Sequence, residues 1–156
     1  VEENWFEKSP LDLSGGQKRR VAIAGVIAMR PGVLVLDEPT AGLDPEARES
    51  LFANIEAYRK ETGSTVVLVT HSMDDIARIA DRLIVMNAGH IVMDGTPEEV
   101  FSRAAELEAI GLTVPEPTKI AMELKRLGVP ITDAIYTTGY LRKAILKLAE
   151  GGAAVC

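Results

Sequence analysis

The sequence predicts an α/β domain with a parallel sheet and flanking helices, followed by a small helical appendage. Three observations support this prediction. Helix-like and strand-like segments alternate from Ser14 to about Arg103, as expected of strands joined by crossover helices. Residues 33–36 form a continuous apolar run, which is typical of a strand covered on both faces, and residues 65–69 are expected to form a second buried strand. Beyond Gly111 the alternation stops, and amphipathic helical stripes replace it.

The first helix is expected to begin after Ser14, because a serine side chain caps a helix N-terminus well. It should end near Met29, since Pro31 and Gly32 follow directly. Residues 21–29 of this helix are apolar but too few to span a bilayer, and we expect them to be buried.

The second helix comes after the strand at 33–36 and is expected to start at Pro45, with Asp44 as its N-cap. Gly63 near its end completes the usual arrangement of proline inside the start and glycine past the end. The second apolar strand, residues 65–69, follows.

The next segments are shorter. A helix is expected from Ser72 to about Ala80, and a third strand over residues 83–86. The turn residues 87–89 then lead into a strand at 91–93, which predicts a hairpin.

The last helix of the domain begins at a predicted capping box, in which Thr96 and Glu99 flank Pro97. We expect this helix to end near Gly111. The proline-containing segment 113–118 that follows is predicted to be a linker.

The chain is therefore divided into residues 1–112 and a linker with two helices, residues 113–156. These helices either pack back on the domain or pair with another copy, and the pattern favours neither arrangement. Their apolar stripes are Ile120, Leu124 and Leu127 in the first helix, and Leu141, Ile145 and Leu148 in the second.

Composition limits the function further. A chain of 156 residues with 47% hydrophobic and 26% charged residues can form one globular domain. A net charge of −6 and only 4% aromatic residues argue against a nucleic-acid partner. The single cysteine, Cys156, has no internal disulfide partner, which fits a reducing compartment. The N-terminal residues lack the pattern of a signal peptide. Because the chain has no initiating methionine, we expect it to begin partway through a longer protein.

Two carboxylates, Asp37 and Glu38, follow directly on the first apolar strand. Open α/β sheets bind ligands at the carboxyl ends of their strands. In phosphoryl transfer, one such carboxylate helps to hold Mg²⁺ and a neighbouring one polarises the attacking water. Taken alone, the same pair is as often a simple turn former.

The glycines after Ser14 point to a phosphate ligand. Gly15 and Gly16 at a helix start present backbone N–H groups, and the helix dipole favours an anion there. A Cβ would keep the backbone away from phosphate oxygens. On its own, Ser-Gly-Gly is most often a flexible turn before a helix.

His71 follows directly on the segment 65–70 of the second strand, at the same predicted sheet edge as the carboxylates. Beside a phosphate site it can donate a hydrogen bond to the γ-phosphate or position a water. An isolated histidine there is more often a structural cap. His90 lies in the hairpin and receives no role. The run Lys18-Arg19-Arg20 is interpreted as a solvated face of the first helix.

Four motifs stand together in one order. They are Leu13-Ser-Gly-Gly-Gln17, Leu36-Asp-Glu-Pro-Thr40, Ala41-Gly-Leu-Asp44 and Thr70-His71. In wording and spacing they resemble the ATP-binding-cassette (ABC) ATPases, a P-loop NTPase-like fold, from about Ser9 to Arg103.

The resemblance implies a role for each site residue. Ser14, Gly15, Gly16 and Gln17 would belong to the signature motif, which contacts ATP held by a partner subunit. Asp37 would be the Walker B aspartate near Mg²⁺, and Glu38 the general base for water. Asp44 would be the D-loop residue that crosses the dimer interface, and His71 the switch histidine.

Within this superfamily, residues 6–25 and 111–115 resemble the ATPase subunits of energy-coupling-factor (ECF) transporters. Such importers pair two related ATPases with a membrane coupling protein and a substrate-binding membrane protein. The ATPases are peripheral, on the cytoplasmic face of the membrane, and the cargo is a vitamin or a transition-metal ion such as cobalt or nickel.

The sequence departs from the family in one respect: no G-x-x-x-x-G-K-[ST] loop occurs in it, and no glycine precedes a lysine. We therefore expect a truncated cassette that is inactive alone, with apolar sheet faces uncovered. Two alternatives remain: a non-catalytic half-cassette that dimerises with a complete ATPase, and a soluble ABC protein of DNA repair or translation.

Overall fold

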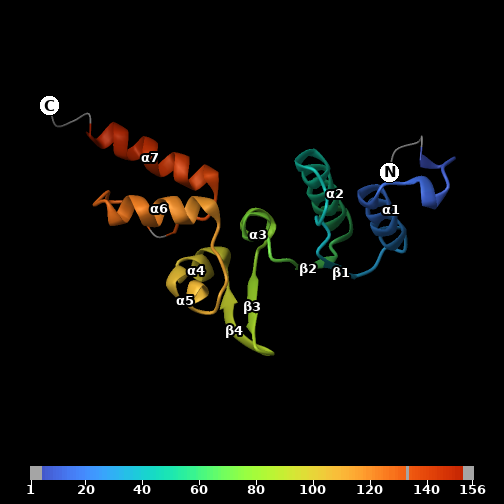
Figure 1. Ribbon diagram of the computed structural model, residues 1–156, viewed down its shortest axis with the longest axis horizontal. Helices are drawn as coiled ribbons and strands as arrows, with labels where there is room; N and C mark the ends of the chain where they lie inside the picture. The colour runs from blue at the N-terminus through green and yellow to red at the C-terminus, as the bar shows by residue number, and fades with distance from the viewer. Residues whose placement is uncertain (1–4, 133, 153–156) are drawn as a thin grey trace. The chain divides into compact units, whose positions relative to one another are not determined.

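The computed structural model describes residues 5–132 and 134–152 (Figure 1). The chain divides into two compact units, and the boundary in the sequence falls between His71 and Ser72. This division differs from the domain boundary predicted after residue 112, which remains a prediction. Cys156 lies outside the described residues. In the described part of the chain, no helix is both long and apolar enough to cross a membrane.

The first unit contains two strands that pair in parallel, in line with the predicted α/β class. The register aligns Val33 with Thr65 and Asp37 with Val69, so both strands end at the same edge. The elements are a 3₁₀ turn η2 (Pro10–Asp12), α1 (Gly15–Ala28), β1 (Val33–Asp37), α2 (Pro45–Thr62) and β2 (Thr65–Val69).

The predicted helix caps are confirmed in this unit. The Ser14 hydroxyl accepts from the Gln17 amide, and the Gln17 side chain accepts from the Ser14 amide, forming a reciprocal capping box. Asp44 caps α2 by accepting from the Ala47 amide at 2.8 Å. Gly63 ends α2 in the left-handed conformation with φ 68°.

The expectation that the apolar strands are covered on both faces is wrong for this chain. Leu34 and Leu36 of β1 are buried, whereas Val33 and Val35 are 58% and 62% exposed. Alternation arises because successive side chains of a strand point to opposite faces. Val67 on β2 is also exposed. The expected uncovered apolar sheet face is therefore present.

The predicted burial of residues 21–29 is also wrong. They lie on α1 as predicted, except Met29, which is its C-cap. Only Ile23 among the residues of this helix is buried, and Met29 is 73% exposed. The helix has apolar side chains all around it, and within the first unit a single face is covered.

The second unit contains the predicted hairpin. Its elements are α3 (Met73–Ile79), β3 (Leu83–Asn87), β4 (His90–Gly95), α4 (Pro97–Phe101), α5 (Ala104–Ala109), α6 (Glu116–Arg126) and α7 (Thr138–Gly152). β3 and β4 pair antiparallel, with Asn87 opposite His90. Ala88 and Gly89 between them both have positive φ, as a tight hairpin turn of the mirror-image type requires.

The helix predicted from Thr96 to Gly111 is broken into α4 and α5. Thr96 and Glu99 form the predicted capping box. The Ser102 hydroxyl then donates to the Glu99 carbonyl at 2.8 Å, and Arg103 leaves the helical conformation with ψ 40°. Serine back-bonding of this kind competes with continued helix.

Residues 113–118, predicted as a linker, are instead packed. Val114 and Thr118 are each only 2% exposed, and the Thr118 hydroxyl donates to the Ile135 carbonyl at 2.7 Å. Val114 belongs to the same buried cluster as Leu83 of β3. The region after residue 112 therefore shares a core with the hairpin.

The C-terminal helices lie side by side (Figure 1). Ala121 of α6 and Leu141 of α7 are buried around Ile131 and Ile135. Of the predicted stripes, Leu124, Leu141 and Leu148 join this cluster. Ile120, Leu127 and Ile145 are exposed, so these members of the predicted stripes are not covered by the described part of this chain.

Candidate functional site

The two predicted catalytic side chains, Glu38 and His71, are in contact. Nδ1 of His71 lies 2.7 Å from Oε1 of Glu38, and the His71 backbone amide donates to the same oxygen at 3.0 Å. The Thr70 hydroxyl donates to the other carboxylate oxygen at 3.4 Å. This contact follows from the topology, because β1 and β2 are parallel and end together.

The electrostatics of the pair favour an ionised carboxylate. Hydrogen bonds from the His71 side chain, the His71 amide and the Thr70 hydroxyl lower the pKa of Glu38, whereas burial acts to raise it. Glu38 is held at φ 45°, and its amide donates to the Val69 carbonyl at 2.8 Å, which anchors this unusual backbone conformation. The carboxylate is thus oriented and unprotonated near neutral pH.

Asp37 ends β1 and has an exposed side chain. Among the described residues, no group of three or more His, Cys, Asp or Glu side chains could hold a metal ion. Mg²⁺ at phosphate sites uses one or two protein carboxylates and takes its other ligands from phosphate and water. A single accessible aspartate therefore fits a Mg²⁺ that is bound together with a nucleotide.

The start of α1 is suited to a phosphate. Within the described part of the chain, the amides of Gly15 and Gly16 have no hydrogen-bond acceptor, because Ser14 caps only the Gln17 amide through its side chain. A Cβ built on Gly15 would meet nothing within 4 Å, so the backbone is open to an approaching ligand. A Cβ on Gly16 would lie 2.9 Å from Leu43 Cδ2.

A cavity of about 650 Å³ opens at this helix start. Its walls combine the signature residues with the loop before α2, so Ser14 and Asp44 line the same space. Trp5 also lines this cavity, and Cζ of the Arg20 guanidinium lies over the Trp5 ring, 5.0 Å from the ring centroid. The Asp44 carboxylate is exposed and engaged in capping α2, and its predicted place at a dimer interface remains a prediction.

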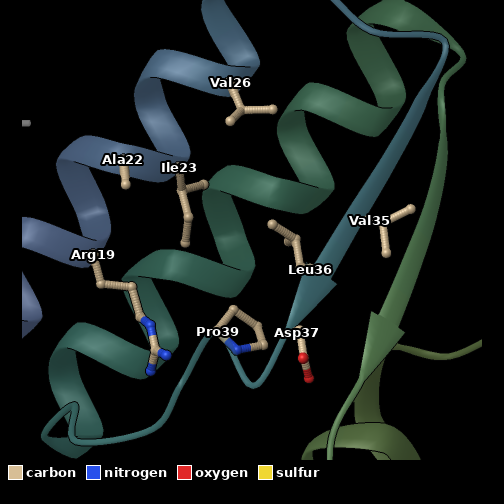
Figure 2. A pocket seen from close by; sticks show the side chains of 8 residues that line it. All are labelled: Arg19, Ala22, Ile23, Val26, Val35, Leu36, Asp37 and Pro39. Carbon is tan, nitrogen blue, oxygen red and sulfur yellow. The ribbon is translucent and has the colours of Figure 1, made fainter.

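A second cavity, of about 220 Å³, lies between α1 and the end of β1 (Figure 2). In this view Arg19 extends from α1, Asp37 from the end of β1, and Pro39 lies between them. Leu36 points toward the helices, whereas Val35 points away.

The sequence interpretation missed Arg19, which was assigned to a solvated face. Its guanidinium donates to the Ala41 carbonyl at 2.9 Å. Arg19 lies four residues after Gly15 and therefore on the same side of α1, and this spacing was the available signal in the sequence. The bond itself joins segments 22 residues apart and has no sequence signature.

The chain is similar to ATP-binding proteins of energy-coupling factor transporters. It is 56% identical over 146 residues to the protein named EcfA2 of Clostridium perfringens, covering 94% of this chain and 51% of that protein. It is 52% identical over 149 residues to EcfA2 of Geobacillus kaustophilus, covering 95% and 51%. The chain thus spans about half the length of these curated relatives, and the resemblance to ECF-type ABC ATPases is confirmed.

Solved structures agree with the α/β fold class. The structure of cbiO1 from Clostridium perfringens, part of the ABC transporter complex cbiONQ, matches 81% of this chain and 46% of its own, with 38% identity and a TM-score of 0.59. The dimeric structure of a bacterial ABC transporter cassette matches 62% and 41%, with 35% identity and a TM-score of 0.58. A family model described as "AAA domain, putative AbiEii toxin, Type IV TA system" matches residues 7–74.

Proposed function

We propose that this chain supplies the signature, Walker B, D-loop and switch segments of the ATP-hydrolysing, energy-coupling subunit of an ECF-type importer. The observation that carries the proposal is the contact between Glu38 and His71 at the shared end of two parallel strands. The open helix start at Gly15 provides the second element that such an ATPase needs.

Glu38 is the residue that accepts a proton from the attacking water. The lowered pKa of Glu38 keeps the carboxylate ionised at neutral pH but makes it a weaker base. Its contribution to catalysis therefore rests on its orientation toward the water. His71 orients Glu38 through Nδ1 and leaves Nε2 available for a phosphate oxygen. A ring that carries a proton on both nitrogens would donate a hydrogen bond to that oxygen. ATP bound with Mg²⁺ supplies the γ-phosphoryl group that reacts with water, and Asp37 would hold the metal.

The partners follow from the same proposal. Asp37, Glu38 and His71 serve ATP bound by their own subunit, whereas Ser14, Gly15 and Gly16 face ATP of a second ATPase subunit. A membrane coupling protein and a substrate-binding membrane protein complete the importer, so the subunit lies peripherally on the cytoplasmic face of the membrane. The cargo is a vitamin or a transition-metal ion.

The 156 residues alone are expected not to hydrolyse ATP, since no phosphate-cradling motif occurs among them. Measurable turnover by the purified chain would refute this expectation. The test of the function itself uses a complete cassette, in which a phosphate-loop segment precedes this sequence in one polypeptide.

In such a cassette, reconstituted with candidate membrane partners in vesicles, we expect ATP-dependent uptake of a labelled vitamin, cobalt or nickel ion. Glu38→Gln should retain ATP binding and lose both hydrolysis and uptake, because an amide cannot accept the proton. Glu46→Gln, an exposed substitution in α2, is the matched control. Hydrolysis by Glu38→Gln at the wild-type rate would contradict the proposal.

A further inference from the structure

We propose that Arg19 is a positioning residue that ties the phosphate-binding start of α1 to the turn that begins at Glu38. This inference rests on the proposed function, and it assigns to Arg19 the transmission of changes between the two ATP sites that one chain serves. It is carried by one hydrogen bond, one close packing contact and the position of Arg19 between two cavities.

The hydrogen bond runs from the Arg19 guanidinium to the Ala41 carbonyl, 2.9 Å away. A bond from a charged donor is stronger than one between neutral groups. It comes from the second turn of α1, close behind the glycines at the helix start. The bond therefore connects the first turns of α1 directly to the backbone of Ala41.

Backbone hydrogen bonds connect the turn around Ala41 to Glu38. The Ala41 amide donates to the Glu38 carbonyl at 3.2 Å, and the Leu43 amide donates to the Thr40 carbonyl at 3.1 Å. Thr40 is only 5% exposed, and Asp44 ends the turn by capping α2. The segment between Glu38 and α2 thus contains two successive hydrogen-bonded turns.

A second contact reinforces the tie. A Cβ on Gly16 would lie 2.9 Å from Leu43 Cδ2, so the Leu43 side chain is seated directly against the backbone of the helix start. The two contacts engage neighbouring residues of the same turn, Ala41 and Leu43. Helix start and turn are therefore held together at two points.

Arg19 is also the one residue that lines both cavities described above. One cavity contains Asp37, and the other contains the signature residues and Asp44. Figure 2 shows Arg19 on the α1 side of the first of these cavities. The Arg19 side chain thus lies between Asp37, which we propose serves the chain's own ATP, and the residues at the start of α1, which we propose serve the ATP of the partner subunit.

The test measures ATP hydrolysis by the complete cassette as a dimer. In Arg19→Met, which keeps the length but removes the donor, we expect kcat to fall about tenfold with KM changed less than about twofold. Because each chain contributes to both ATP sites, we expect the wild-type dimer to hydrolyse ATP cooperatively, and this cooperativity should be lost in Arg19→Met. Arg19→Lys, which keeps a donor, should recover most of kcat.

The matched control is Lys18→Met, because Lys18 is an adjacent cation and, in the described part of the chain, its side chain makes only a long hydrogen bond of 3.4 Å to the Leu11 carbonyl. It should keep wild-type kcat and cooperativity. Equal behaviour of Arg19→Met and Lys18→Met would overturn the assignment. So would a loss of kcat in Arg19→Met with unchanged cooperativity, since this would indicate a purely structural role.

A measurement on the 156-residue chain separates this inference from the proposed function. Amide hydrogen exchange at Ala41 and Leu43 should accelerate in Arg19→Met and not in Lys18→Met, whether or not the cassette hydrolyses ATP. Unchanged exchange would overturn the tie. Absence of turnover in the wild-type cassette, with accelerated exchange in Arg19→Met, would instead contradict the proposed function alone.

Discussion

His71 binds one carboxylate oxygen of Glu38 twice, through Nδ1 at 2.7 Å and through its backbone amide at 3.0 Å. The two residues are 33 positions apart and meet because their strands are parallel and end at the same edge. The histidine ring is 85% exposed, so a ligand can reach it, while the carboxylate is about one-third exposed at 31%. The pair is thus both preorganised and accessible.

The first prediction concerns pH. The folded protein lowers the pKa of Glu38, chiefly through the His71 side-chain hydrogen bond. Glu38 therefore adds stability above its ordinary pKa of 4.5, and this stability is lost as the pH falls through the lowered value. In His71→Ala the Glu38 titration midpoint should move upward, measured by ¹³C NMR of the carboxyl carbon.

The control for this titration is His90→Ala, which removes the other histidine of the chain, an exposed one in the hairpin. It should leave the Glu38 midpoint where it is in the wild type. A midpoint that stays unchanged in His71→Ala would show that the hydrogen bond does not set the pKa.

A second prediction concerns Asp44 as a helix cap. Asp44→Ala removes the acceptor for the Ala47 amide and should lower the free energy of unfolding by about 1 kcal/mol. Asp44→Asn keeps an acceptor and should lose much less. Urea unfolding of the chain compares the three proteins, and equal stability of Asp44→Ala and the wild type would refute the capping role.

The uncovered sheet face leads to a third prediction. Val35 is 62% exposed in the described structure, on the face opposite the buried Leu36. Val35→Lys should reduce self-association of the 156-residue chain, seen by analytical ultracentrifugation, with stability changed by less than about 0.5 kcal/mol. In the complete cassette, where we expect this face to be covered, the same substitution should instead impair folding.

Leu36→Lys is the opposite-face control for this experiment. Leu36 is only 7% exposed, so a lysine there should unfold the chain itself. If Val35→Lys self-associated as strongly as the wild type, the exposed sheet face that carries Val33 and Val35 would not be the surface through which the chain self-associates.

Local chemistry made much of this structure predictable. Ser14 and Asp44 were identified as caps because their side chains act on amides two or three residues away. The Glu38 and His71 positions followed from apolar strands, since parallel strands end together. Such features need no knowledge of distant contacts.

The missed features depend on distant contacts. Arg19 stands in a basic run that is equally consistent with a solvated face, and only the approach of Ala41 gives it a partner. On α6, the predicted face with Ile120 and the observed face with Ala121 both repeat at helical spacing. The segment with Ile131 and Ile135 decides between them, because it packs on the second face.

The central claim is that this chain contributes to two ATP sites, with Glu38 in one and Ser14 in the other. The most direct test compares two mixed dimers of the complete cassette that carry the same two lesions, Glu38→Gln and Ser14→Arg. In one dimer both lesions lie in a single subunit, and in the other they lie in opposite subunits. Steady-state ATP hydrolysis is measured for both.

With the lesions in opposite subunits, both damage the same site and the other site stays intact, so this dimer should hydrolyse ATP. With both lesions in one subunit, each site loses one essential group, so that dimer should be inactive. Equal activity of the two dimers, or activity only when one subunit carries both lesions, would contradict the account.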